Sequence, residues 1–481
     1  MAHMINLSQN QYCNNLTYAL IFSFFLAILF FLTLGRNNSS PVSKYIFILY
    51  GIFVMPRLLM MVFSPELVVF PFEGINISQI NAGMTLFLFS TIALFFGLII
   101  GEKVLPPNLI SISKQKILPR YIFIIFISAL TIEIFLNFIL QQNTFNLDRR
   151  LNNYHFFFEI LRFFSATDVI LFASLIYFFT DKARQASWAW VILSYLSISI
   201  VFSMSVLGGS RSGSLRLLQQ FIAIYLVVYK FKTISFKSAA VFFTFIFLFS
   251  IISWPLGSLV RNSILYNKDH QWEASKISTD IKDYVERDKN EISSQNFGVA
   301  AQILNRLSIV DYAILLPYAS KNREAFQKFS SPEYIFKSTA NAILPGNPFS
   351  DSLLSTSRSI NIIFRGASEK VVLSSGYFSE FWTSFSLFFL LFGFFSVGIH
   401  FLIGLFLHVG YVCISKIKSN YVVPMLVFYT YLCPGLILFT MGIDHTIQTF
   451  LVLSIQFFIF FGIYKSLLFF SSTYQFYKSK C

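Results

Sequence analysis

Long apolar segments recur along the chain and are separated by polar segments. Each apolar segment holds about 17–25 residues, the length that a helix needs to cross the roughly 30 Å hydrocarbon core of a bilayer. The sequence predicts about eleven such spans, at residues 16–34, 45–63, 82–101, 119–140, 165–180, 188–207, 212–230, 238–259, 384–413, 422–441 and 447–468. The ninth span is long, so we expect it to tilt or to begin as an interfacial turn. The pattern predicts an all-α fold, a polytopic membrane-embedded helical bundle.

The spans divide the chain into three parts. Residues 5–260 hold the first eight transmembrane helices, and residues 378–481 hold helices nine to eleven and a short cytoplasmic tail. Between them, residues 261–377 form the one extramembrane segment of domain size. Its helical spacing predicts mostly short helices, among them residues 297–318 and 333–344, the second ended by Pro345 and Gly346.

Composition agrees with the span pattern. Of the 481 residues, 56% are hydrophobic and only 12% are charged, whereas soluble domains carry about 25% charged residues. The four cysteines are scattered, without the spacing of a metal site or of a disulfide framework. The net charge of +14 does not require a nucleic-acid partner, because cytoplasmic loops of membrane proteins collect lysine and arginine.

The basic residues alternate between successive loops, and this alternation predicts the orientation. They collect in the odd-numbered loops and in the C-terminal segment: Arg36, Lys44, Lys103, Lys114, Lys116, Arg120, Lys182, Arg184, Lys230, Lys232, Lys237, Lys416, Lys418, Lys465, Lys478 and Lys480. These segments are therefore predicted to be cytoplasmic. In a bacterial inner (cytoplasmic) membrane the N-terminus is then periplasmic and the C-terminus cytoplasmic.

Ionisable residues gather at the predicted external ends of the spans. The sharpest motif is the glycine-rich turn 208–214, which contains Arg211 and opens the seventh span from outside. A helix N-terminus, glycines, serine hydroxyls and an arginine together suit a phosphate group. Arg149 and Arg150 begin a predicted amphipathic helix in the interface, which makes a second candidate anion site. The alternatives are a tight turn with a headgroup-seeking arginine and the binding of ordinary anionic lipid.

The large loop and its borders supply further candidates. Arg261 closes the eighth span outside, Arg306 lies on the predicted helix 297–318, and Arg358 and Arg365 lie in a polar segment, 347–375, that could cover a substrate. Glu380, Asp444 and His445 lie at external ends of spans and are the candidates for a catalytic acid or base. For each of them a structural role is the competing interpretation.

Several catalytic signatures are missing from the sequence. It has no P-loop, no Asp-x-Asp pair, no His-Glu-x-x-His and no Gly-x-Ser-x-Gly. The predicted cytoplasmic loops are too short for a nucleotide-binding domain. We therefore expect no metal and no cofactor, with arginines stabilising a departing pyrophosphate.

The architecture resembles the Wzy-type O-antigen and oligosaccharide repeat-unit polymerases. The resemblance is carried by the turn around Arg211, by residues 343–345, and by residues 376–382, which lead into a glycine-punctuated span. This family has Arg-x10-Gly patterns in two periplasmic loops. Arg365 and Gly376 match that spacing, whereas no such pair is found at Arg149, Arg150 or Arg211.

The resemblance implies a metal-independent glycosyltransferase of GT-C-like architecture that acts at the periplasmic face in lipopolysaccharide biosynthesis. Its partners would be a donor glycan on undecaprenyl pyrophosphate, an acceptor hydroxyl on the next lipid-linked repeat, membrane lipids and a chain-length regulator protein. An O-antigen ligase is the alternative enzyme. A catalytic histidine in the large loop would favour this alternative, and the only histidine in the loop sequence is His270. A lipid-linked oligosaccharide flippase is the alternative that is not an enzyme. Polar residues through the depth of the helical bundle would favour it.

Overall fold

A computed structural model of the chain describes residues 39–63, 77–106, 119–134, 211–228, 323–344, 356–365, 367–374, 383–417, 422–439 and 443–480. It also describes single residues at 21, 25, 26, 28, 161, 164, 313, 348, 349 and 354. Within these residues the fold is helical and contains no strand, which confirms the predicted all-α class for this part of the chain. The predicted spans at 165–180, 188–207 and 238–259, and nearly all of that at 16–34, lie outside the described residues.

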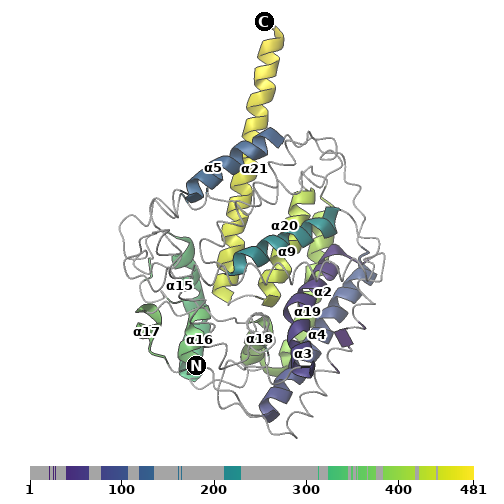
Figure 1. The fold of residues 1–481 in the computed structure, drawn as a ribbon, viewed down its shortest axis with the longest axis vertical. Helices are drawn as coiled ribbons and strands as arrows, with labels where there is room; N and C mark the ends of the chain where they lie inside the picture. The colour runs from purple at the N-terminus through teal and green to yellow at the C-terminus, as the bar shows by residue number, and fades with distance from the viewer. Residues whose placement is uncertain are drawn as a thin grey trace, which may run out of the picture.

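The described helices are grouped by the predicted segment in which they lie, a membrane set in the predicted spans and a loop set in the predicted large loop. The membrane set is α2 (Pro41–Phe53), α3 (Met55–Phe63), α4 (Ile77–Val104), α5 (Pro119–Ile134), α9 (Arg211–Val228), α18 (Ser384–Phe392), α19 (Ser396–Ser415), α20 (Val422–Phe439) and α21 (Ile443–Lys480). The loop set is α14 (Arg323–Ser330), α15 (Pro332–Ile343), α16 (Thr356–Arg365) and α17 (Glu369–Ser374). Figure 1 shows the loop set grouped beside the bundle.

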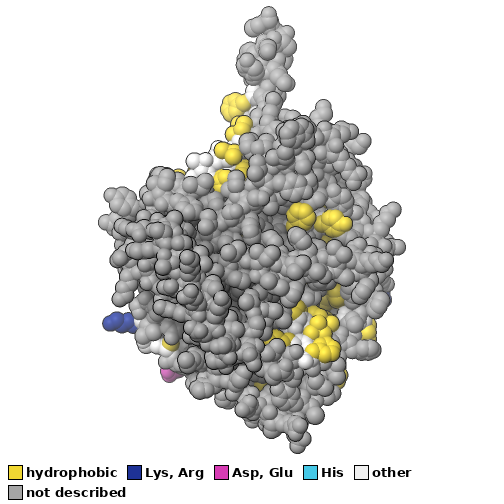
Figure 2. All heavy atoms as spheres, in the orientation of Figure 1, with side chains coloured by type: hydrophobic (Ala, Val, Ile, Leu, Met, Phe, Trp, Pro, Cys, Tyr) yellow, Lys and Arg dark blue, Asp and Glu magenta, His cyan; other side chains and the backbone are white. Residues whose placement is uncertain are grey.

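Four segments of the described chain are long and apolar enough to cross a membrane. They are Pro41–Met61, Ile80–Val104, Ser384–Ser415 and Thr449–Phe470, and they coincide with four of the predicted spans. Shorter apolar helices, Gln219–Val228 and Val422–Pro434, lie within two further predicted spans. These segments indicate a membrane protein. Figure 2 shows the molecule in the orientation of Figure 1. Most of the described side chains visible on this face are hydrophobic, and acidic and basic side chains lie at the edge near α17.

Among the described helices, α4 and α19 run parallel and make the most extensive contact. Gly97 of α4 faces the backbone of Phe401, and Gly404 of α19 faces the backbone of Leu94, so a β-carbon on either glycine would overlap the other helix. Further along both helices, the Nε2 atom of His408 lies 2.7 Å from the Leu105 carbonyl oxygen. The missing β-carbons therefore permit the close approach of the two backbones.

A polar cluster fastens the start of α2 to the end of α4. One carboxylate oxygen of Glu102 accepts hydrogen bonds from the Ser40 amide, at 2.8 Å, and from the Ser43 hydroxyl, at 2.6 Å. Lys44 is buried and interacts electrostatically with the same carboxylate. The start of α2 and the ends of α4 and α19 therefore lie together.

The predicted ninth span is two helices rather than one. Gly393 has a φ of 58°, a left-handed conformation that glycine adopts without a β-carbon clash, and the 3₁₀ turn η6 (Gly393–Phe395) separates α18 from α19. The 20 residues of α19 alone extend about 30 Å, enough to cross the hydrocarbon core. The excess length of the span is thus used in a separate short helix.

Candidate functional site

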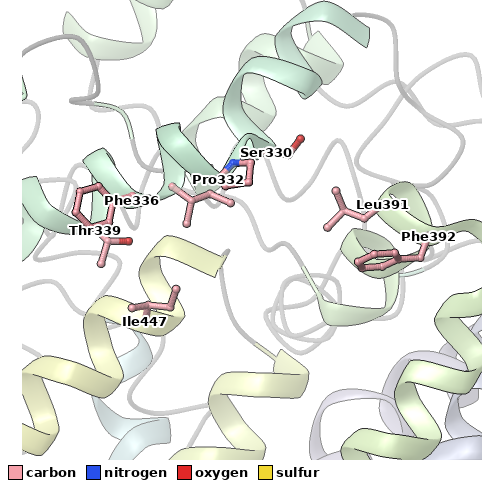
Figure 3. A pocket seen from close by; sticks show the side chains of 8 residues that line it. Ser330, Pro332, Phe336, Thr339, Leu391, Phe392 and Ile447 are labelled. Atoms are coloured by element: carbon pink, nitrogen blue, oxygen red, sulfur yellow. The ribbon is translucent and has the colours of Figure 1, made fainter.

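A cavity lies between helices of the predicted large loop and helices of the predicted spans. Its volume is about 500 Å³, and it is lined by residues from α14 and α15, from the end of α18 and from the first turns of α21: Ser330, Pro332, Ile335, Phe336, Thr339, Leu391, Phe392 and Ile447. Figure 3 shows the residues of α15 and Ile447 on one side and Leu391 and Phe392 across from them. The lining is apolar apart from two hydroxyl residues.

Local sequence fixes the loop wall of the cavity. Ser331 caps α15, because its hydroxyl accepts a hydrogen bond from the Tyr334 amide at 3.2 Å, and Pro332 occupies the first turn, where no backbone donor is needed. The Tyr334 hydroxyl then donates to the Leu354 carbonyl at 2.8 Å, and its ring packs edge-on against Phe329. These contacts orient α15, whose Ile335, Phe336 and Thr339 line the cavity.

Thr339 is the polar group in the cavity wall without a partner. Its side chain is 7% exposed, and its hydroxyl makes no hydrogen bond to the described part of the chain. The other hydroxyl residue, Ser330, donates to the Phe326 carbonyl at 2.7 Å. Only Thr339 is therefore left with an unused buried donor in this wall, and buried donors are ordinarily paired.

For two of the three predicted acid–base candidates, the backbone lies beside the cavity. Asp444 and His445 occupy the first turn of α21, which begins at Ile443, and Ile447 in the next turn lines the cavity. Glu380 lies outside the described residues, three positions before Thr383, the N-cap of α18. The side chains of Asp444 and His445 also lie outside what the structure describes.

Two predicted arginines lie on a helix that packs against α21. Arg358 is in the first turn of α16 and Arg365 is its last residue, and α16 contacts α21. Two parts of the predicted polar covering segment, 347–375, form short helices, α16 and α17, and Ile360 and Ile363 of α16 recur at helical spacing and are fully buried. The backbones that carry Arg358, Arg365, Asp444 and His445 therefore belong to two contacting helices.

The remaining predicted arginines divide into one on a described helix and four elsewhere. Arg211 is the first residue of α9, which contacts α20 and α2, whereas residues 208–210 of the predicted glycine-rich turn lie outside the described residues. Arg149, Arg150, Arg261 and Arg306 lie outside the described residues. In the described helices, no three His, Cys, Asp or Glu residues are grouped closely enough to hold a metal ion.

A buried polar cluster at the start of α18 is a feature that the sequence analysis missed. Thr383, Ser384 and Ser386 at the start of α18, and Ser396 and His400 on α19, are each at most 7% exposed. The His400 ring stacks on Phe385 at 4.4 Å, and its Nδ1 donates to the Ser396 carbonyl at 2.7 Å. The signal was present as a histidine inside an apolar run, together with the Thr-Ser-Phe-Ser sequence, but neither indicates which helix faces them.

Comparison with models of known protein families, with curated proteins and with solved structures finds no match to this chain. The fold and the site therefore rest on the residues described above.

Proposed function

We propose that this chain polymerises lipid-linked oligosaccharide repeat units at the external face of the inner membrane, as the resemblance to the Wzy-type polymerases implies. The proposal includes about eleven spans, a periplasmic large loop and a cytoplasmic C-terminus. The four apolar segments and the grouping of the start of α2 with the ends of α4 and α19 support this arrangement.

One observation carries the proposal. The loop helix α16, with Arg358 and Arg365, packs against α21, with Asp444 and His445 in its first turn. Cationic groups that stabilise a leaving pyrophosphate and a group that accepts a proton are what a metal-independent glycosyl transfer requires. The contact between α16 and α21 supports a single site that contains both the arginines and the proton-accepting group.

The chemistry assigns one role to each set. The acceptor hydroxyl gives its proton to a base, for which Asp444, His445 and Glu380 are the candidates, and its oxygen forms a bond to the anomeric carbon of the donor. The bond from that carbon to the pyrophosphate oxygen breaks, and the electron pair stays on the pyrophosphate. Arg211, Arg358 and Arg365, with Arg149, Arg150, Arg261 and Arg306, are the candidates that balance this charge.

The decisive experiment supplies the purified full-length protein, in lipid nanodiscs, with a single undecaprenyl-pyrophosphate-linked repeat. We expect a ladder of products of increasing glycan length. A single unmodified species would overturn the proposal. Transfer to an added lipid A core instead would identify a ligase, and translocation of the lipid-linked repeat without elongation would identify a flippase.

Variants then test the proposed role of the arginines. We expect Arg211→Ala and Arg358→Ala to abolish chain extension while the protein stays in the membrane. Lys328→Ala is the matched control, because Lys328 is an exposed cation on the same loop that pairs with Glu369 at 3.1 Å. Equal loss of extension in the control would mean that loop integrity, rather than the arginines, sets the activity.

A further inference from the structure

The cavity between α15, α18 and α21 has the size and lining of a ligand site. Its volume of about 500 Å³ lies within the range of about 300–1,000 Å³ that is typical of small-molecule pockets. Six of its eight lining residues are apolar, and they come from three helices that are far apart in the sequence. An apolar ligand, or the apolar part of a larger one, fits this lining.

The apolar surface around the cavity continues to the outside of the protein. Phe336 and Phe392 line the cavity and are 67% and 50% exposed, and Phe394 and Phe395 in the adjoining turn η6 are 79% and 85% exposed. Such a rim is unfavourable in water but favourable against hydrocarbon. The apolar lining therefore continues onto the exposed surface beside the cavity.

A single polar group marks one wall. The Thr339 hydroxyl is buried and has no partner in the described part of the chain, so it has a hydrogen bond left to donate. Asp444 and His445 lie about one helical turn before Ile447, which borders the cavity on the same side as α15 (Figure 3). The occupant thus combines hydrocarbon with a hydrogen-bond acceptor placed directly next to it.

We propose that this cavity binds the isoprenoid units next to the phosphate of a polyprenyl-phosphate carrier, with Thr339 donating to a phosphate oxygen. In a polyprenyl phosphate the hydrocarbon begins at the phosphate oxygen itself, so the apolar chain and the acceptor are adjacent. In a phospholipid a glycerol ester separates the acyl chain from the phosphate. The identity of the carrier rests on the proposed function, whereas the cavity and its free hydroxyl do not.

The test measures binding without turnover, using the full-length protein in phosphatidylcholine nanodiscs and decaprenyl phosphate as the probe. Thr339→Val keeps the shape of the side chain and removes the hydroxyl, and should weaken decaprenyl phosphate binding about five- to tenfold. The same variant should bind decaprenol, which lacks the phosphate, as the wild type does. Equal affinity of Thr339→Val and wild type for decaprenyl phosphate would overturn the role of Thr339.

A second variant tests the cavity itself. Ile335→Trp places a larger ring in the wall and should weaken both decaprenyl phosphate and decaprenol at least tenfold. Phe406→Ala is the matched control, because Phe406 is an apolar residue on α19, 64% exposed and not part of the cavity lining. Unchanged binding in Ile335→Trp, or equal competition by phosphatidylglycerol, would overturn the proposal.

The two proposals fail in different ways. Wild-type binding of decaprenyl phosphate that depends on Thr339 and Ile335, combined with no product ladder, would refute the polymerase and leave the cavity assignment standing. A product ladder from Ile335→Trp at the wild-type rate would refute the cavity assignment and leave the polymerase standing.

Discussion

Gly97 of α4 and Gly404 of α19 pack reciprocally, because each lies against the backbone of the helix that carries the other. In a bilayer, helices gain little from burying apolar surface against one another, and close backbone packing supplies much of the attraction. The pair therefore sets the spacing of two predicted spans that are far apart along the chain.

Enlarging either glycine should separate the helices. We expect Gly97→Ala and Gly404→Ala each to destabilise the protein by about 1–3 kcal/mol, because the added methyl group overlaps backbone that cannot move away easily. Thermal unfolding of the detergent-purified protein measures the effect. Gly398→Ala on the same helix is the control, as nothing lies within 4 Å of a β-carbon there. Equal melting temperatures for all three variants would contradict the prediction.

The Glu102 carboxylate should anchor the start of α2. In Glu102→Ala the Ser40 amide and the Ser43 hydroxyl lose their shared acceptor, which we expect to cost about 1–3 kcal/mol. Glu102→Gln should lose less, because its amide oxygen still accepts. Hydrogen–deuterium exchange of residues 40–45 reports the loosening, and Lys103→Ala is the exposed neighbour for comparison. The prediction is wrong if Glu102→Ala exchanges no faster than Lys103→Ala.

Neighbouring hydroxyls at the start of α18 should respond in opposite ways. Thr383 accepts from the Ser386 amide at 3.3 Å, so Thr383→Ala removes a helix cap and should cost about 1 kcal/mol. The Ser384 hydroxyl is buried without a partner in the described part of the chain, so Ser384→Ala should leave stability unchanged or raise it. Thermal unfolding compares the two directly. A larger loss for Ser384→Ala would show that this hydroxyl is paired.

Labelling should place exposed lysines on two sides of the membrane. In a background in which the four cysteines are replaced by serine, Lys103→Cys and Lys416→Cys should react with a membrane-impermeant maleimide only after the membrane is permeabilised. Lys370→Cys, on α17 of the large loop, should react in intact spheroplasts. Labelling of Lys103→Cys and Lys370→Cys from the same side would contradict the predicted orientation.

The apolar helices that the structure describes were predictable because the length of an apolar run is enough to identify them. The residues at which these helices begin and end were not predictable from hydropathy. The apolar run 45–63 corresponds to the span Pro41–Met61, which starts earlier because Ser40 caps the helix and Pro41 opens it. The helix predicted at 333–344 is α15, Pro332–Ile343, for the same kind of reason. Hydropathy alone does not register the left-handed Gly393 that divides the ninth span.

The site was less predictable because it depends on contacts across the chain. Arg358 and Asp444 were candidates by residue type, but only the packing of α16 on α21 brings their backbones into contacting helices. Nothing in the sequence around Thr339 distinguishes it from other threonines, since its significance comes from its burial in a cavity that Ile447 and Phe392 also line. The grouping around His400 likewise required the turn at Gly393.

The contact between α4 and α19 also has a consequence for biogenesis. Leu105 and His408 are separated by 303 residues, and at a synthesis rate of about 5–20 residues per second α19 follows α4 by roughly 15–60 s. During that interval the glycine face of α4 is in the membrane without its final neighbour. The packing of these two helices against each other therefore forms only after α19 has been synthesised.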